Sequence, residues 1–288
     1  MSVQAVLLAD GRLHLQHGPI DCLCRAWGEA DEIEAAYGQA VAAFPAILPA
    51  LCDELVLLRT PLPSPCPLGA VAGAMHAACL PFAANGFMTP MAAVAGAVAD
   101  HVLVAMTKGR NLARAFVNNG GDIALHLTPG AALRCGLVSD LAAPALDATM
   151  TIKGADWIRG IATSGSACKG NGGRSFSRGI ADSVTVLADT AARADAAATV
   201  IANAVDLPGH AAIVRRPAAE IDPDSDLGVL PVTWEVGLLT LSDIDGALDA
   251  GRVVADALLR DGLIAGAALV LRGRFAVSGA RMRELETA

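Results

Sequence analysis

The chain has 288 residues, of which 54% are hydrophobic and 17% charged, so it can form a folded core and wholesale disorder is excluded. Its 21 Lys and Arg residues stand against 29 Asp and Glu residues, a formal net charge of −8. Because no run of basic residues forms a stripe that could neutralise a phosphate backbone, nucleic acid is not an expected partner.

The N-terminal segment lacks a basic region, and Asp10 to Arg12 interrupt it before an apolar signal sequence can develop. The most apolar segments, 91–106 and 196–205, contain polar residues such as Asp100 and fall short of the uncharged length that a membrane span requires. We therefore expect a cytoplasmic protein without a membrane partner. The seven cysteines are scattered, with no CxxC pair or zinc spacing, so buried reduced thiols are expected.

The first part of the chain predicts antiparallel strands followed by helices. Residues 5–8 and 13–16 flank a turn as a hairpin, and 20–27 form a third strand. A helical pattern begins at Glu29 and is interrupted at Pro45 and Pro49, and the proline-rich segment 59–67 is an extended connector. Two helices of small residues follow at 68–80 and 90–106, the second opened by Thr89 as N-cap and Pro90 in the first turn.

The second part alternates strands and helices in blocks. Strands are predicted at 113–117, 123–127, 134–138 and 148–153, then a glycine-rich loop, a strand at 183–187 and a helix from about 190. A surface loop at 220–226, a strand at 233–241, a helix at 244–263 with Ser242 as N-cap and a hairpin at 267–277 complete the chain. Such blocks favour an α+β fold with antiparallel sheets.

The stretch from Ile161 to Val205 carries the strongest signal for a functional site. It joins a loop with five glycines between Gly165 and Gly179 to a strand and an alanine-rich helix, and glycine lets a backbone approach a bulky anionic ligand. On that helix Asp195 and Thr199 are four residues apart, so both side chains lie on one face within reach of one ligand or hard cation. A solvated helix edge is the alternative reading of this pair.

Five segments in the same order resemble the ApbE-like superfamily, and more closely its uncharacterised, non-exported branch. They are FMTPMAAVAGAVA (87–99), VNNGGDI (117–123), IATSG (161–165), RSFSRGIADSVTV (174–186) and ADAAATVIANAV (194–205). The resemblance implies a duplicated T-fold-like α+β architecture with antiparallel sheets and packed helices, and a single domain over 1–288 built from two intertwined halves. For characterised members it implies magnesium-dependent transfer of FMN from FAD onto a threonine of an acceptor protein, with release of AMP.

The resemblance also assigns roles to residues of this chain. The ADxxxT signature falls on Asp195 and Thr199 as metal ligands, with Asp195 also catalytic. The flavin or nucleotide contacts that it implies are Asn119, Gly120, Gly121, Asp122, Thr163, Ser164, Gly165, Arg174 and Ser175. Arg174 stands where the branch has a histidine; an arginine cannot act as a base but can clamp a phosphate. Asp122 or Asp182 is then the carboxylate expected to take a proton.

Three functions stay open at this point. The first is a cytoplasmic magnesium-dependent FMN transferase or FAD pyrophosphatase. The second is a role in making or handling a pterin such as tetrahydromethanopterin in one-carbon metabolism. The third is a flavin-binding or scaffold protein without catalysis. The cofactors implied are Mg²⁺ with FAD or FMN, or a pterin. The helix at 90–106 suits a homodimer contact and suits burial within one chain equally well.

Overall fold

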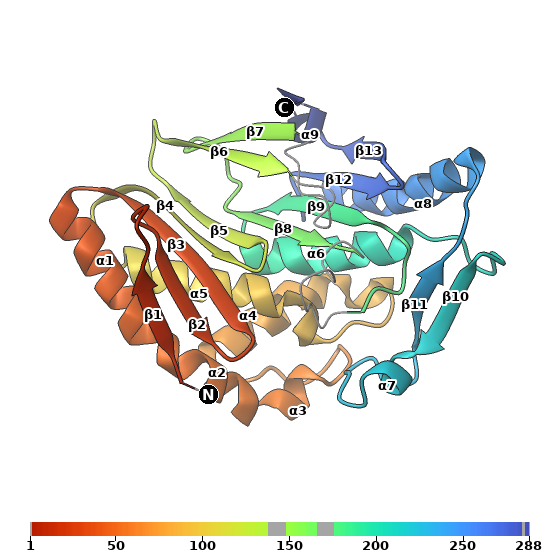
Figure 1. Cartoon of the computed structure of the whole chain (residues 1–288), viewed down its shortest axis with the longest axis horizontal. Helices are drawn as coiled ribbons and strands as arrows, with labels where there is room; N and C mark the ends of the chain where they lie inside the picture. The colour runs from red at the N-terminus through yellow and green to blue at the C-terminus, as the bar shows by residue number, and fades with distance from the viewer. Residues whose placement is uncertain (1, 138–147, 166–175, 284–285, 288) are drawn as a thin grey trace. The chain divides into compact units, whose positions relative to one another are not determined.

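A computed structural model describes residues 2–137, 148–165, 176–283 and 286–287 (Figure 1). It is a mixed fold of helices and antiparallel strands, so the predicted α+β class with antiparallel sheets is confirmed. The chain forms two compact units, each assembled from separate segments. Unit 1 contains 1–134, 151–162 and 187–196, and unit 2 contains 135–150, 163–186 and 197–288. The expected single domain of two intertwined halves stays a prediction.

Unit 1 is built on antiparallel strands that follow each other in the order β1-β2-β3-β4-β5-β8. The strands are β1 (Gln4–Leu7), β2 (Leu13–His17), β3 (Ile20–Gly28), β4 (Leu112–Asn119), β5 (Asp122–Leu127) and β8 (Gly160–Ser164). The first five were predicted within a few residues. Strand β8 corrects the sequence interpretation, which made 161–165 part of a loop. Three of its five residues are buried, and its Ile161 pairs with Ile123 of β5.

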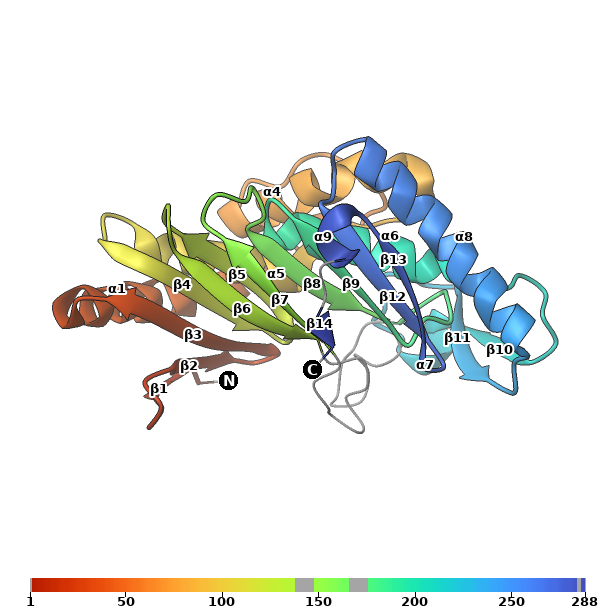
Figure 2. The ribbon, with the colours of Figure 1, turned by 90° about the horizontal axis from the view of Figure 1, so that it is seen from above.

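The helices of unit 1 cover the strands with small side chains. They are α1 (Ala30–Ala43), η1 (Phe44–Ala46), α2 (Ile47–Asp53), α3 (Leu55–Leu58), α4 (Ala70–Cys79), η2 (Leu80–Asn85), η3 (Pro90–Ala93) and α5 (Val94–Thr107). Helix α5 packs against β4, β5 and α1 (Figure 2). Thr89 is the N-cap residue with Pro90 in the first turn, as predicted, but its side chain makes no capping hydrogen bond and the turn that it opens is the 3-10 turn η3 that precedes α5. The Asp195 side chain accepts the first amides of α5.

Unit 2 holds the hairpin of β12 (Gly266–Leu271) and β13 (Arg274–Ser278), covered by α8 (Leu241–Arg260), and the ribbon of β10 (Ile213–Pro217) and β11 (Pro231–Val236). The hairpin was predicted and β10 was not. The N-cap of α8 is Thr240 and not Ser242, because Thr240 and Asp243 form a reciprocal capping box. The remaining elements are β6 (Ala132–Leu137), β7 (Ala148–Lys153), β9 (Ser183–Ala188), α6 (Ala191–Ala204), α7 (Ala218–Ile221), α9 (Ala280–Arg283) and β14 (Glu286–Thr287).

Two helical stretches of the described chain, 30–53 and 90–107, are long and apolar enough to cross a membrane by length and composition alone. Core helices meet the same test, and half of the second stretch is buried. The absence of a membrane partner therefore stays a prediction.

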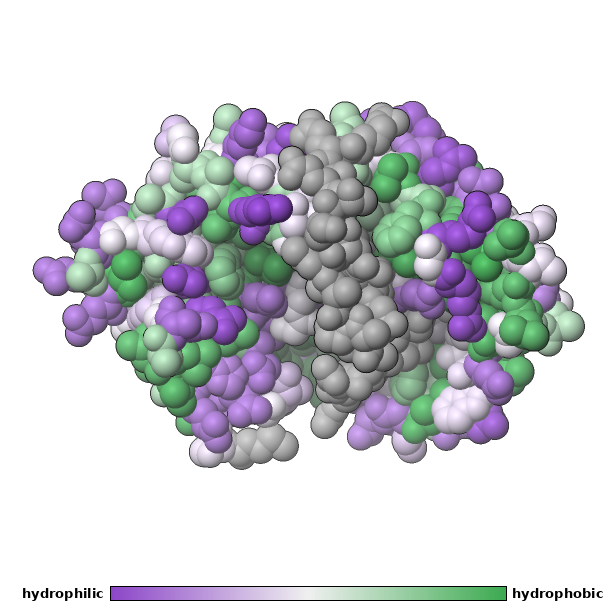
Figure 3. Space-filling view, turned by 45° about the horizontal axis from the view of Figure 1, so that its top comes forward, coloured by the Kyte–Doolittle hydropathy of each residue, from purple (hydrophilic) through white to green (hydrophobic). Residues whose placement is uncertain are grey.

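On the face in Figure 3, apolar and polar residues lie intermixed. The expectation of buried cysteines holds for Cys22, Cys24 and Cys79, but Cys52 and Cys66 are exposed.

Candidate functional site

The turn between β4 and β5 places an acidic side chain at the start of β5. Gly120 and Gly121 have φ of 64° and 111°, a left-handed conformation that favours glycine and makes a two-residue hairpin. The side-chain oxygen of Asn118 accepts a hydrogen bond from the Gly121 amide at 2.8 Å. Asn119 and Asp122 flank this turn and are paired across the two strands. The predicted hairpin is thus confirmed.

Asn119 connects this hairpin to the beginning of α5. Its side-chain nitrogen donates to the carbonyl oxygen of Ala95 at 3.0 Å, and its side-chain oxygen accepts from the Asp21 amide at 3.3 Å. The residue is only 6% exposed. The side-chain nitrogen therefore links Asn119 to α5 and the oxygen links it to β3, and a contact of Asn119 with a flavin stays a prediction.

Asp195, on α6, binds the same end of α5. Its carboxylate accepts a hydrogen bond from the Gly96 amide at 3.1 Å and another from the Ala95 amide. Amides in the first turn of a helix have no partner within the helix, and the helix dipole favours a negative charge there. Asp195 thus supplies a carboxylate cap to α5 from a distant part of the chain.

A second carboxyl group lies next to that of Asp195. Asp122 is 7% exposed and shares a side-chain hydrogen bond with Asp195. Burial, and then repulsion by Asp122, raise the pKa of Asp195 well above its usual range. Two carboxylates can share a hydrogen bond only if a proton lies between them, and a bound cation can take the place of that proton. Capping of α5 explains the contacts of Asp195 with backbone amides but not the adjacent Asp122.

This donor set fits Mg²⁺ better than a metal with many protein ligands. Within the described residues, no group of three or more His, Cys, Asp or Glu side chains could hold a metal ion. Mg²⁺ is bound in nucleotide sites by one or two carboxylates, with phosphates and waters filling the octahedron. Thr199, the other predicted ligand, follows Asp195 by one turn of α6 and is partly exposed. Its role stays a prediction.

The other predicted site residues lie in unit 2 or outside the described residues. Thr163 and Thr185 hydroxyls are 2.9 Å apart, and Gly165 has φ of 126° where a Cβ would meet the Asp182 carbonyl oxygen at 2.7 Å. Ser164 ends β8. The Asp182 carboxylate accepts a hydrogen bond from the Arg272 amide. Arg174 and Ser175 are not among the described residues.

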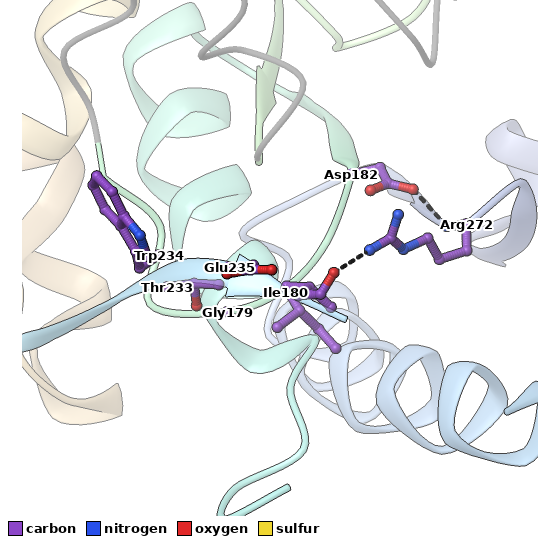
Figure 4. Close-up of a pocket in the computed structure, with 8 residues that line it drawn as sticks. Gly179, Ile180, Asp182, Thr233, Trp234, Glu235 and Arg272 are labelled. Carbon is purple, nitrogen blue, oxygen red and sulfur yellow. Dashed lines mark hydrogen bonds between the residues drawn. The ribbon is translucent and has the colours of Figure 1, made fainter. Parts of the chain in front are cut away.

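Asp182 also borders a cavity of about 250 Å³ within unit 2, which Figure 4 shows. Thr233, Trp234 and Glu235 of β11 line it on one side, and the guanidinium group of Arg272 reaches the Val236 carbonyl oxygen at 2.7 Å. Trp234 is half exposed and stacks on Arg216, whose guanidinium carbon is 4.4 Å from the ring centre. The cavity thus offers one cationic and two acidic side chains to a small polar ligand.

Two residues important for the geometry of unit 1 were missed from the sequence, Gly96 and Asp100. A Cβ on Gly96 would lie 2.3 Å from the Ala191 carbonyl oxygen, so α5 and α6 touch through their backbones. Asp100 accepts hydrogen bonds from the Ala191 and Ala192 amides at 3.0 and 2.9 Å. The available signal was a glycine and a lone acidic residue in an otherwise apolar helix.

A family model described as "AbpE bacteria" matches residues 5–277 of the chain. A UPF0280 protein of Methanospirillum hungatei is 35% identical over 126 residues, 44% of this chain and 49% of the relative. A UPF0280 protein of Methanopyrus kandleri is 37% identical over 147 residues, 51% of this chain and 54% of the relative. The chain thus spans about half the length of these curated relatives.

Two solved structures are also similar. The apo flavinyl transferase ApbE of Pseudomonas stutzeri has a TM-score of 0.48 and 14% identity, covering 98% of this chain and 96% of that one. The apbe protein of Thermotoga maritima has a TM-score of 0.38 and 15% identity, covering 90% and 78%. Similarity at this level does not indicate shared chemistry.

Proposed function

The chain belongs to the ApbE-like family described as "AbpE bacteria", and on that premise we propose that it binds a flavin nucleotide with Mg²⁺ at Asp195. The substrate is FAD, and the reaction class is transfer of its FMN part to an acceptor hydroxyl, of a protein or of water. The proposal includes Thr199 as the second protein ligand on α6 and a cytoplasmic location. The relatives named UPF0280 carry no activity in their names, so the chemistry rests on the residues of this chain.

The observation that supports the proposal most is the hydrogen-bonded pair of Asp122 and Asp195. A buried pair of like groups is unfavourable unless a proton or a cation compensates it. Helix α5 directs the Ala95 and Gly96 amides at the same carboxylate, and the Gly96 amide orients its Oδ2 atom. A carboxyl pair oriented in this way suits a cation that arrives with a phosphate ligand.

The chemistry would be nucleophilic displacement at phosphorus. The acceptor oxygen forms a bond to the phosphorus of the FMN part while the bond from that phosphorus to the bridging oxygen breaks, and AMP leaves. The hydroxyl proton passes to a carboxylate, for which Asp122 is placed next to the Asp195 carboxyl group. A bound Mg²⁺ supplies neutralisation of the charge that develops on the phosphoryl oxygens. The protein residues orient the pyrophosphate.

Chromatography of FAD incubated with the purified protein tests this proposal. We expect Mg²⁺-dependent appearance of FMN and AMP in equal amounts, slow with water alone because a carboxylate is a weak base at neutral pH. Asp195→Asn should abolish it, and Asp182→Asn should not if Asp122 is the base. Mg²⁺-independent FAD binding without any turnover would contradict the transferase and favour a flavin-binding protein.

Ligand binding to the same purified protein tests the pterin alternative. Binding of a reduced pterin in preference to FAD, measured by calorimetry with and without Mg²⁺, would replace the flavin in this proposal. Flavin recognition predicts that FAD binds at least tenfold more tightly than the pterin when Mg²⁺ is present.

A further inference from the structure

Helices α5 and α6 cap each other. The first amides of α5, those of Ala95 and Gly96, donate to Asp195 of α6, and the first amides of α6, those of Ala191 and Ala192, donate to Asp100 of α5. The two helices touch at Gly96, where a side chain would collide with the Ala191 backbone. Each helix therefore fixes the start of the other.

The amides of the first four residues of α6 each have a partner. Asp100 takes the first two, and the Thr190 hydroxyl accepts from the Arg193 amide at 3.2 Å, while the Ala194 amide donates to the Thr190 carbonyl oxygen at 3.1 Å. The Ala194 bond is the first one within the helix, so among the free amides that precede it those of Ala191 and Ala192 are bound by Asp100. Asp195 follows this anchored turn directly.

We propose that Asp100 is a positioning residue of the site: by holding the first turn of α6, it keeps the Asp195 carboxylate against the Gly96 amide and beside Asp122. The expected effect on metal binding rests on the proposed function. The expected effect on the position of Asp195 rests on the geometry alone. Asp100 has no part in contacting the ligand. An amide side chain of the same shape accepts one of the two α6 amides and presents N–H groups to the other, so it shifts the turn that carries Asp195.

The cost of retaining a charge at this position supports the proposal. Burial raises the pKa of Asp100 to about 6, against the opposing effect of the Ala192 and Ala191 amides, and nearby Asp189 raises it further. Asp189 is paired with Arg193 at 2.6 Å, so this cation is already engaged. The two α6 amides oppose this rise because they bind the ionised form, whose two oxygens accept one amide each.

The test compares Asp100→Asn with Asp243→Asn, which removes a carboxylate cap from α8 in unit 2. The first measurement is hydrogen exchange at single amides by NMR. We expect the Gly96 amide, which Asp100 does not touch, to exchange at least tenfold faster in Asp100→Asn and at the wild-type rate in Asp243→Asn. The second is binding of Mn²⁺ in the presence of FAD, followed by the loss of the free-ion signal in electron paramagnetic resonance. Affinity should fall about tenfold in Asp100→Asn only.

The outcomes separate this inference from the proposed function. If wild-type protein binds no Mn²⁺ with FAD, the proposed function fails, and the Gly96 amide still decides the positioning role. Faster exchange confined to Ala191 and Ala192, with Gly96 and Mn²⁺ affinity unchanged, would overturn the inference and leave Asp100 a simple helix cap. If Asp100→Asn does not fold, Asp100→Glu, which moves the carboxylate by one methylene, carries the same expectations.

Discussion

An aspartate carboxylate accepts backbone amides at the starts of both α6 and α8, but the two carboxylates lie in different surroundings. At α8 the cap is local and exposed: the Thr240 hydroxyl accepts from the Asp243 amide at 3.1 Å, and the Asp243 carboxylate accepts from the Thr240 amide at 2.8 Å. At α6 the first two amides go to Asp100, 91 and 92 residues earlier in the chain. The cap of α8 therefore forms within four consecutive residues, whereas the cap of α6 forms only when unit 1 is folded.

The two caps also differ in the sign of their electrostatic effect. Hydrogen bonds from Thr240 lower the pKa of Asp243, so its ionised form is favoured in the folded protein. Burial raises the pKa of Asp100 to about 6, so its ionised form is disfavoured. The cap of α8 is therefore favourable for its own carboxylate, whereas the cap of α6 holds the turn that carries Asp195 at some cost in stability.

The largest effect is expected where α5 and α6 touch. Gly96→Ala would place a methyl group within 2.3 Å of the Ala191 carbonyl oxygen, and backbone cannot move aside easily, so the free energy of unfolding should fall by more than about 3 kcal/mol. Gly38→Ala is the matched control, because a Cβ there meets nothing within 4 Å on helix α1. It should raise stability by up to about 1 kcal/mol in urea unfolding. Equal effects of the two substitutions would mean that the helices are not in contact.

Loss of the Asp195 charge should have the next largest effect, on binding rather than on folding. Asp195→Asn retains the shape of the side chain and one acceptor for the α5 amides, but it cannot neutralise a cation. We expect Mg²⁺-dependent FAD affinity to fall at least about 100-fold, about 2.7 kcal/mol, by calorimetry. The circular dichroism spectrum should stay native. An unchanged affinity would remove Asp195 from the site.

A smaller effect is expected in the pH dependence of stability. Because the folded protein holds a proton on Asp100 more tightly than the unfolded chain does, this residue favours folding fully below about pH 4, and the benefit is lost as the pH rises through about 6. The loss amounts to about 2 kcal/mol once partial solvent exposure is allowed for. The difference in unfolding free energy between wild type and Asp100→Asn should therefore change between pH 4 and 7. A pH-independent difference would contradict it.

The smallest effect is expected at the local cap. Thr240→Ala removes the acceptor for the Asp243 amide and should lower stability by about 1 kcal/mol at neutral pH. FAD and metal binding should not change, since α8 does not carry a proposed ligand. Weaker Mn²⁺ binding in this variant would show that any loss of helix stability affects the site, and the contrast between the two caps would fail.

The sequence predicted best what depends on neighbouring residues. Strands β2 and β3 follow from alternating burial, and the β4–β5 hairpin follows from glycines that adopt positive φ at Gly120 and Gly121. The cap of α8 was predicted two residues too late, because Ser242 and Thr240 are equally good caps until the position of Asp243 is considered.

What the sequence could not reveal depends on contacts across long distances in the chain. Asp195 was singled out for its spacing from Thr199, but its partners Gly96 and Asp122 are 99 and 73 residues away. Strand β8 was missed because only two of its five residues, Ile161 and Thr163, favour strands, and the segment is stabilised by pairing with β5. Asp100 looked like a charge interrupting an apolar helix until Ala191 and Ala192 were placed beside it.

The most direct test of the central claim is the number of protons released when Mg²⁺ binds. If Asp122 and Asp195 share a proton that the cation replaces, calorimetry of Mg²⁺ binding with FAD at pH 7, in buffers of different ionisation enthalpy, should show a net release of protons. Asp195→Asn should abolish both the binding and the release. Tight Mg²⁺ binding without proton release, or equal binding by Asp195→Asn, would show that the carboxyl pair is not the metal site.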